Sequence, residues 1–219
     1  MDISSYIEYT LLKATTTERE IIDLCYEAKE SNFYAVCINT AYVAFAKQLL
    51  DKTNIKVSTV VGFPLGAMST AAKVYEAKKA IEDGADEIEM VINLGFLKSR
   101  NHVSVLKDIC DVKYAIGNTP LKVILEISEL NKNEIIKACE ICLDAKADYI
   151  KTSSGFSKSG ATLTATKIIK KTIKNAAKIE ASGDIEDFET GMKYIEAGVH
   201  RLGITTLFKK SSFISLSKL

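Results

Sequence analysis

Charged side chains occur inside apolar, β-branched segments, where a buried strand would normally be hydrophobic. Glu89, Lys122, Lys151 and Glu180 are examples. Because side chains alternate between the two faces of a strand, residues two positions apart share a face. A buried lysine amine can form a Schiff base with a carbonyl compound, and a nearby carboxylate can then move protons between substrate and water. These residue types therefore favour carbon–carbon bond chemistry on a carbonyl compound.

The amine of such a lysine must be neutral before it can attack a carbonyl carbon. At a reference pKa of about 10.4, only about 0.04% of lysine side chains are neutral at pH 7. Burial or a neighbouring cation would have to lower the pKa of the amine. The sequence therefore predicts that the reactive lysine lies inside the protein, next to another charged group.

An unpaired buried charge costs several kcal/mol, so we expect the charged residues to pair with one another or with a polar ligand. The alternative is that some of them lie at strand ends in solvent or form an inert ion-pair network, and for Glu87 we favour this alternative. The expected interior set comprises Lys122, Lys151 and Lys178 with Glu8, Glu89, Glu126 and Glu180.

Strand-like apolar segments alternate with amphipathic helical segments along the whole chain. This spacing is typical of a βα unit repeated eight times, and it predicts one (β/α)₈ TIM barrel over residues 1–219. An open doubly wound sheet is the alternative, but no G-x-G-x-x-G motif follows the first strand. The expected strands are 6–10, 34–39, 56–62, 87–93, 122–128, 148–154, 178–183 and 200–205.

Two of the helical segments carry clear end signals. Thr17 with Glu20 three residues later is the pattern of a capping box, and Gly84 is typical of a helix end. The opposite strand faces, such as Val123 and Leu125, are apolar and should meet the helices.

Composition excludes several classes of function. There are 29 Lys and Arg against 28 Asp and Glu, for a net charge of +1, which speaks against a nucleic-acid-binding surface or a polybasic membrane anchor. We see no membrane span and no secretory signal. The five cysteines indicate reduced thiols and a cytoplasmic protein. Cys139 and Cys142 form a C-x-x-C, which a buried helix face explains better than a metal site. We expect no metal and no cofactor.

Six segments resemble successive blocks of the deoxyribose-phosphate aldolase family. The resemblance runs from about residue 6 to about residue 206. It implies a class I aldolase on a (β/α)₈ barrel without a metal, which cleaves 2-deoxyribose 5-phosphate reversibly to acetaldehyde and glyceraldehyde 3-phosphate. The segments are AVCINTAYV, VSTVVGFPLGA, GADEIEMVINLG, KVILEISEL, ADYIKTSSGFSKSGAT and EASGDI.

The resemblance implies roles for individual residues. Lys151, in KTSSGF, matches the Schiff-base lysine, and Glu89 matches the position of the proton-relay aspartate. Cys37 matches a cysteine beside the site, although a small buried residue needs no functional role. The family's second catalytic lysine falls on Glu180, and a carboxylate there would favour protonated Lys151. Lys178 either substitutes for that lysine in part or only neutralises Glu180.

The expected phosphate end also departs from the family pattern. The family has Gly-Gly-Ile-Arg where this chain has GDIE, so Asp184 and Glu186 would repel a phosphate. The alternative is that Asp184 simply caps the next helix. Thr205 and Thr206 could still donate hydrogen bonds. The expected substrate-binding residues are Glu8, Cys37, Lys122, Glu126, Ser153, Gly155, Ser182, Gly183, Gly203, Thr205 and Thr206.

Three functions remain open from the sequence. The first is an aldolase of the deoxyribose-phosphate type. The second is a diverged Schiff-base enzyme acting on another carbonyl compound, unphosphorylated or positively charged near Asp184 and Glu186. The third is a barrel without catalytic activity. We expect a small aldehyde, ketone or sugar phosphate as the partner, and a homodimer is a further expectation.

Overall fold

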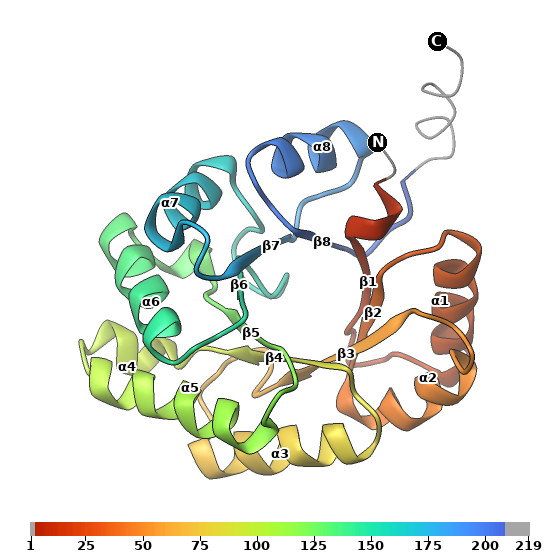
Figure 1. The fold of residues 1–219 in the computed structure, drawn as a ribbon, viewed down its shortest axis with the longest axis horizontal. Coiled ribbons are helices and arrows are strands. Elements are labelled where there is room, and N and C mark those ends of the chain that lie inside the picture. Colours follow the sequence, from red (N-terminus) through yellow and green to blue (C-terminus); the bar gives the residue numbers. More distant parts are fainter. Residues whose placement is uncertain (1–2, 209–219) are drawn as a thin grey trace.

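The computed structural model describes residues 3–208 and contains a closed barrel of eight parallel strands in chain order. Figure 1 shows the first strand, β1, lying beside the last, β8, and the two are hydrogen-bonded in parallel. The predicted (β/α)₈ barrel is confirmed. The strands are β1 (Ile7–Leu11), β2 (Ala35–Ile38), β3 (Lys56–Val61), β4 (Glu87–Val91), β5 (Leu121–Ile124), β6 (Tyr149–Lys151), β7 (Lys178–Ser182) and β8 (Arg201–Ile204).

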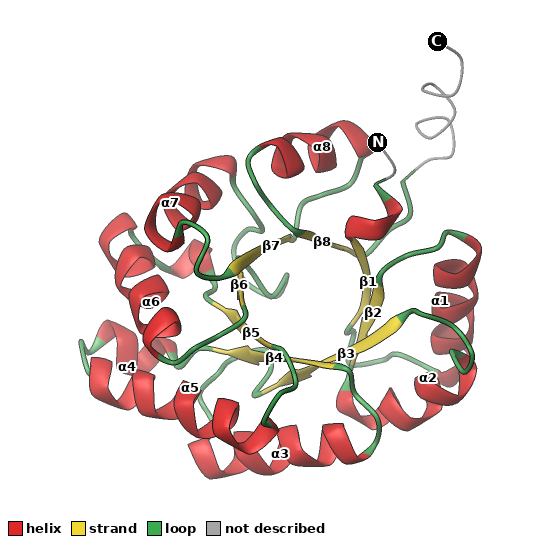
Figure 2. Ribbon diagram, viewed as in Figure 1, coloured by secondary structure: helices red, strands yellow, loops and turns green. Residues whose placement is uncertain are grey.

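Helices surround the barrel on its outer side (Figure 2). Short 3₁₀ turns lie at Ser4–Tyr6, Thr40–Tyr42 and Ile127–Glu129. The α-helices are α1 (Glu18–Glu30), α2 (Val43–Leu49), α3 (Thr70–Glu82), α4 (Leu94–Lys98), α5 (His102–Ile116), α6 (Lys132–Asp144), α7 (Leu163–Ile173) and α8 (Phe188–Glu196).

The main hydrophobic core lies between the outer strand faces and the helices. Val123 and Leu125 are fully buried there, as the alternation of the sequence predicts. Thr17 caps α1 in a complete capping box with Glu20, which satisfies backbone donors that the first helical turn leaves free. Gly84, with a φ of +103°, follows the end of α3 as predicted, because a residue without Cβ tolerates this left-handed conformation.

The fifth strand is shorter than predicted. It ends at Ile124, and Glu126 then adopts a left-handed conformation with a φ of +57° before the turn Ile127–Glu129. Glu126 therefore does not continue the inward face of Lys122 in regular alternation. Its carboxylate instead holds the next loop, since it accepts hydrogen bonds from the backbone N–H and the hydroxyl of Ser154.

All five cysteines are free thiols, and Cys139 and Cys142 are buried on one face of α6. Among residues 3–208, no helix is long and apolar enough to cross a membrane.

Candidate active site

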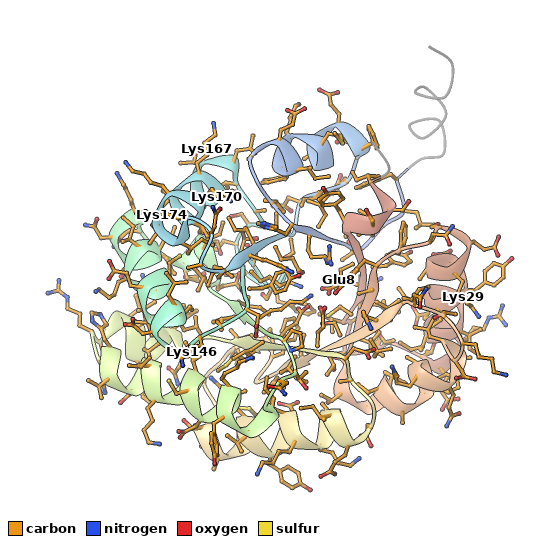
Figure 3. The ribbon with its side chains drawn as sticks, viewed as in Figure 1. Glu8, Lys29, Lys146, Lys167, Lys170 and Lys174 are labelled. Carbon is orange, nitrogen blue, oxygen red and sulfur yellow. The ribbon has the colours of Figure 1, made fainter. Side chains whose placement is uncertain are left out.

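Five charged side chains from five different strands meet inside the barrel, and we refer to them as the interior charge cluster. Each is at most 3% exposed. Figure 3 shows the β1 member inside the ring of strands, whereas the labelled lysines of α7 lie outside it. The members are Glu8 of β1, Glu89 of β4, Lys122 of β5, Lys151 of β6 and Glu180 of β7.

Strand register brings these side chains to similar heights. Glu89 is paired with Lys122 across β4 and β5, and Lys151 with Glu180 across β6 and β7. Gly203 of β8 leaves room for them. A Cβ atom at Gly203 would lie 3.3 Å from Oε1 of Glu180 and 3.7 Å from Nζ of Lys151. The glycine therefore permits close approach of the charged side chains.

Nζ of Lys151 contacts three carboxylates. It lies 2.6 Å from Oε2 of Glu89, 2.6 Å from Oε1 of Glu180 and 3.2 Å from Oε1 of Glu8. Nζ of Lys122 contacts the same three residues, at 2.8 Å from Oε2 of Glu180, 3.0 Å from Oε1 of Glu89 and in a close contact with Glu8. Both ammonium groups therefore share one set of carboxylates.

The three carboxyl groups of the cluster differ in how readily they ionise. Burial, together with the charges of Glu180 and Glu89, raises the pKa of Glu8 well above its usual value. Burial also disfavours the ionised forms of Glu89 and Glu180, but the two lysines outweigh it and lower the pKa of both. Glu8 is therefore the member of the cluster whose carboxyl group holds a proton most readily.

The pKa of Lys151 follows from the same contacts. Burial alone would lower it, but the charges of Glu180, Glu89 and Glu8 raise it well above the usual value. Lys151 therefore rests as an ammonium ion. A carbonyl compound can react only with the small neutral fraction, unless its binding displaces a carboxylate.

A small cavity of about 40 Å³ opens beside Lys151 at the carboxyl ends of the strands. Glu89, Ser182 and Thr205 also line it. A second cavity, of about 230 Å³, lies beside the first and shares four lining residues with it, Gly155, Gly183, Gly203 and Thr205. A carbonyl carbon attached to Lys151 would thus have space for a chain that extends outward. In (β/α)₈ enzymes this end of the barrel carries the active site.

Comparison with known proteins decides the family. The family model described as "DeoC/LacD family aldolase" matches residues 8–198. The chain belongs to this family of aldolases. Membership makes it a class I aldehyde-lyase.

Named proteins agree with the family assignment. "Deoxyribose-phosphate aldolase 1" of Mesoplasma florum is 48% identical over 93% of this chain and 92% of its own. The structure titled "QR15, an Aldolase" has a TM-score of 0.89 at 40% identity, and it covers 93% of this chain and 91% of its own. The structure titled "Unique tetrameric structure of deoxyribose phosphate aldolase from Aeropyrum pernix" has a TM-score of 0.84 at 26% identity, covering 93% and 86%.

In this aldolase, Lys178 does not lie in the interior, and that prediction is wrong. It is the first residue of β7, its side chain is exposed, and its Nζ lies 5.3 Å from the ring centroid of Tyr149. The two-residue period correctly puts Lys178 on the face of Glu180, but at the amino end of the barrel. Lys122 is the cation that pairs with Glu180 besides Lys151.

Glu87 was expected either in solvent at a strand end or in an ion-pair network, and with 3% of it exposed it lies in an ion pair with Lys122. Its Oε1 accepts a hydrogen bond of 2.6 Å from the hydroxyl of Tyr34, and its Oε2 lies 2.9 Å from Nζ of Lys122. Sequence reasoning also missed Ser58, whose hydroxyl donates to Oε1 of Glu89 at 2.9 Å. The two-residue alternation in 56–61 was the signal that could have found Ser58.

The remaining predicted residues are distributed over the loops at the carboxyl ends. Ser182 donates from its hydroxyl to the carbonyl of Ser153 at 2.5 Å, and this bond joins the ends of β6 and β7. Thr206 lines the larger cavity. Glu126 lines a different cavity, near Phe156, and does not contact Lys151 within the cluster.

Cys37 is buried next to the cluster. Burial and the charges of Glu89 and Glu8 raise the pKa of its thiol well above the usual value, so it is not a thiolate nucleophile. The ligand atoms of Cys37, Glu8 and Glu89 lie within 4.8 Å of one another and could hold a metal ion. Lys151 and Lys122 already contact both carboxylates, so a divalent cation would have to displace their ammonium groups.

Asp184 does not cap the following helix. The N-cap of α8 is Asp187, which accepts a hydrogen bond from the backbone N–H of Thr190. Asp184 instead adopts a left-handed conformation, with a φ of +59°, and its Oδ2 accepts a 2.7 Å hydrogen bond from the backbone N–H of Gly160.

Proposed function

We propose that this aldolase reversibly cleaves a 2-deoxy aldose into acetaldehyde and a hydroxyaldehyde through a Schiff base on Lys151. The observation that supports this most is the position of the Lys151 side chain. It lines the cavity at the carboxyl ends of the strands, while its Nζ lies 2.6 Å from a carboxylate oxygen of Glu89. An amine and a proton acceptor are therefore in contact at the place where a substrate would enter.

Formation of the Schiff base requires Lys151 to lose a proton. We assign Oε2 of Glu89 as the acceptor, because it is in direct contact with Nζ. The neutral amine then adds to the substrate aldehyde carbon to give a carbinolamine. Glu89 returns the proton to the carbinolamine hydroxyl and the C–O bond breaks. Water departs, and the iminium ion remains on Lys151.

Cleavage uses the iminium ion as an electron sink. Glu89 takes the proton of the hydroxyl group on substrate carbon 3, and the bond between carbons 2 and 3 breaks. Its electron pair moves toward the iminium nitrogen, which leaves an enamine on Lys151 and releases a hydroxyaldehyde. Protonation of the enamine at carbon 2 and addition of water then release acetaldehyde and restore the amine.

Two candidate substrates share carbons 1–3, where the proposed reaction takes place. The relatives' names point to 2-deoxyribose 5-phosphate, and 2-deoxyribose has the same carbons 1–3 without the phosphate. The proposed chemistry therefore requires acetaldehyde release from at least one of these two compounds.

The test is reductive trapping. Protein incubated with acetaldehyde is treated with borohydride, digested and mapped by mass spectrometry, with Lys107 as an exposed reference lysine. We expect an ethyl adduct on Lys151 that the Lys151→Met variant lacks, together with acetaldehyde release from at least one of the two sugars. A folded protein without an adduct on Lys151 between pH 6 and 10 would overturn the proposal.

We also propose that residues 1–219 form one domain, that the protein is cytoplasmic, and that it forms a homodimer. The five free thiols support the location. Oligomerisation is supported by the tetramer named for the aldolase from Aeropyrum pernix, and by the exposed Val103 and Tyr114 of α5. Light scattering after size-exclusion chromatography distinguishes a monomer from a dimer.

A further inference from the structure

The larger cavity beyond Lys151 must hold the distal end of a substrate that is attached to this lysine. Gly155, Gly183, Gly203 and Thr205 line both this cavity and the one around Lys151. The cavity volume of about 230 Å³ is sufficient for a short hydroxylated chain. The chemistry of its walls therefore selects what the far end of the substrate can be.

We propose that Asp184 makes this cavity selective for an uncharged, hydroxylated chain end and excludes a phosphate group. The preferred substrate is then an unphosphorylated 2-deoxy aldose. This inference rests on the proposed function, because the orientation of the substrate follows from its attachment to Lys151.

The first argument is that Asp184 uses a backbone donor that a bound anion would need. Its Oδ2 accepts from the N–H of Gly160 at 2.7 Å. Both residues line the cavity. The protein's own carboxylate thus takes the place of an external anion at this N–H group.

The second argument is the charge of the cavity wall. Asp184 and Glu186 contribute two carboxylates, and Lys158 contributes one ammonium group. Nζ of Lys158 already lies 3.0 Å from Oε2 of Glu129. Among the residues that the structure describes, a phosphate in this cavity would therefore face two carboxylates and one ammonium group that is already paired. Like charges brought together in this way disfavour binding.

The third argument is that the remaining polar groups suit a neutral ligand. Ser157, Thr205 and Thr206 present hydroxyl groups along the wall. A sugar hydroxyl can donate a hydrogen bond to the carboxylate of Asp184 or Glu186 and accept one from these hydroxyls. A fully ionised phosphate has no proton to donate to a carboxylate.

The backbone conformation at Asp184 allows two substitutions that remove its negative charge without backbone strain. Its φ of +59° suits glycine, so Asp184→Gly removes the carboxylate without backbone strain. Asp184→Asn removes only the charge, since asparagine tolerates this conformation and its amide oxygen can still accept from Gly160. Asp187→Asn is the matched control. It removes a nearby charge that does not line the cavity and keeps a good helix cap.

The experiment measures kcat/KM for 2-deoxyribose and 2-deoxyribose 5-phosphate by acetaldehyde release. We expect the wild type to favour 2-deoxyribose by at least about tenfold. Asp184→Gly and Asp184→Asn should shift this ratio toward the phosphate by about tenfold, whereas Asp187→Asn should shift it little. A ratio within one variant cancels any loss of overall activity. Inorganic phosphate should inhibit cleavage of 2-deoxyribose by Asp184→Gly more strongly than cleavage by the wild type.

Two failures are distinguishable. If Lys151 is trapped by acetaldehyde and the wild type prefers the phosphorylated sugar, or if neither Asp184 variant changes the ratio, the inference is wrong and the proposed function stands. If acetaldehyde is not trapped on Lys151 at all, the proposed function fails and the inference fails with it.

Discussion

Oε1 of Glu180 lies 2.6 Å from Nζ of Lys151, at the position where the resemblance to the aldolase family implies a second lysine. The carboxylate stabilises the ammonium form of Lys151, which cannot attack a carbonyl carbon. Replacement of this carboxylate by a cation would favour the neutral amine.

Glu180→Lys should therefore increase the rate of Schiff-base formation at neutral pH by about tenfold, because one neighbouring charge commonly shifts a pKa by at least about one unit. The measurement is the rate of borohydride trapping with acetaldehyde. Glu180→Gln is the control, since it removes the negative charge without adding a positive one, and it should give a smaller increase. An unchanged rate in a folded Glu180→Lys variant would contradict the role assigned to Glu180.

The wild-type protein should show a pronounced pH dependence of trapping. Because the pKa of Lys151 is raised well above its usual value, the neutral fraction should grow about tenfold per pH unit throughout the range below that pKa. The rate of adduct formation on Lys151 should rise from pH 7 to pH 10 without a plateau. A plateau near neutral pH would show that Lys151 loses its proton more easily than its three carboxylate contacts imply.

The two buried glutamates Glu8 and Glu89 should respond differently to the same substitution. The pKa of Glu8 is raised well above its usual value, so above pH 4.5 its folded state resists ionisation at a cost in stability, and Glu8→Gln should stabilise the protein at pH 7. Glu89 is ionised and contacts both lysines. Glu89→Gln should therefore destabilise by about 3–5 kcal/mol. Urea denaturation measures both values, and equal losses would contradict the raised pKa of Glu8.

The pH dependence of stability tests the directions of the two pKa shifts. The folded pKa of Glu89 is lowered, so its contribution is present above the usual carboxyl pKa of 4.5 and is lost as the pH falls through the lower folded value. The folded pKa of Glu8 is raised, so its contribution is complete below 4.5 and is lost as the pH rises through the raised value. Glu8→Gln should thus gain stability relative to the wild type as the pH rises above 4.5.

Lys122 should be far more important for stability than a surface lysine. It is fully buried and contacts Glu8, Glu87, Glu89 and Glu180. Lys122→Met keeps a long unbranched side chain but removes one of the two ammonium groups that Glu8, Glu89 and Glu180 share and the lysine that Glu87 contacts, which should cost about 3–5 kcal/mol. Lys107→Met breaks an exposed pair with Asp111 and should cost less than about 1 kcal/mol. Similar losses in urea denaturation would argue against a cooperative interior cluster.

The sequence predicted the alternation of strands and helices well, because hydrophobic periodicity and caps are local properties. It also identified four of the charged positions that meet around Lys151, since lysine and glutamate are rare on inward faces unless they pair. It could not predict how far along the barrel axis a side chain lies. The two-residue period gives the face of a strand but not the height along the barrel, so Lys178 was misplaced in the interior and the contact of Glu87 with Lys122 was not predicted.

The loops were harder to predict for a related reason. Asp184 and Asp187 are both reasonable helix caps by residue type, and only the backbone conformation of 183–187 distinguishes them. Glu126 leaves the alternation of β5 because its backbone is left-handed, which no hydrophobic pattern reveals. Contacts between loops, such as Asp184 with Gly160, depend on the folded ends of neighbouring strands.

Lys122 and Lys151 contact the same three carboxylates, those of Glu8, Glu89 and Glu180. In evolutionary terms, this sharing makes the five positions one epistatic unit. A charge reversal at position 180 changes the pKa of Glu8 as well as the reactivity of Lys151, so its effect on fitness depends on the residues already present at the other four positions. We expect substitutions at positions 8 and 180 to be coupled among related aldolases, so that each substitution is tolerated only in proteins that already carry the other.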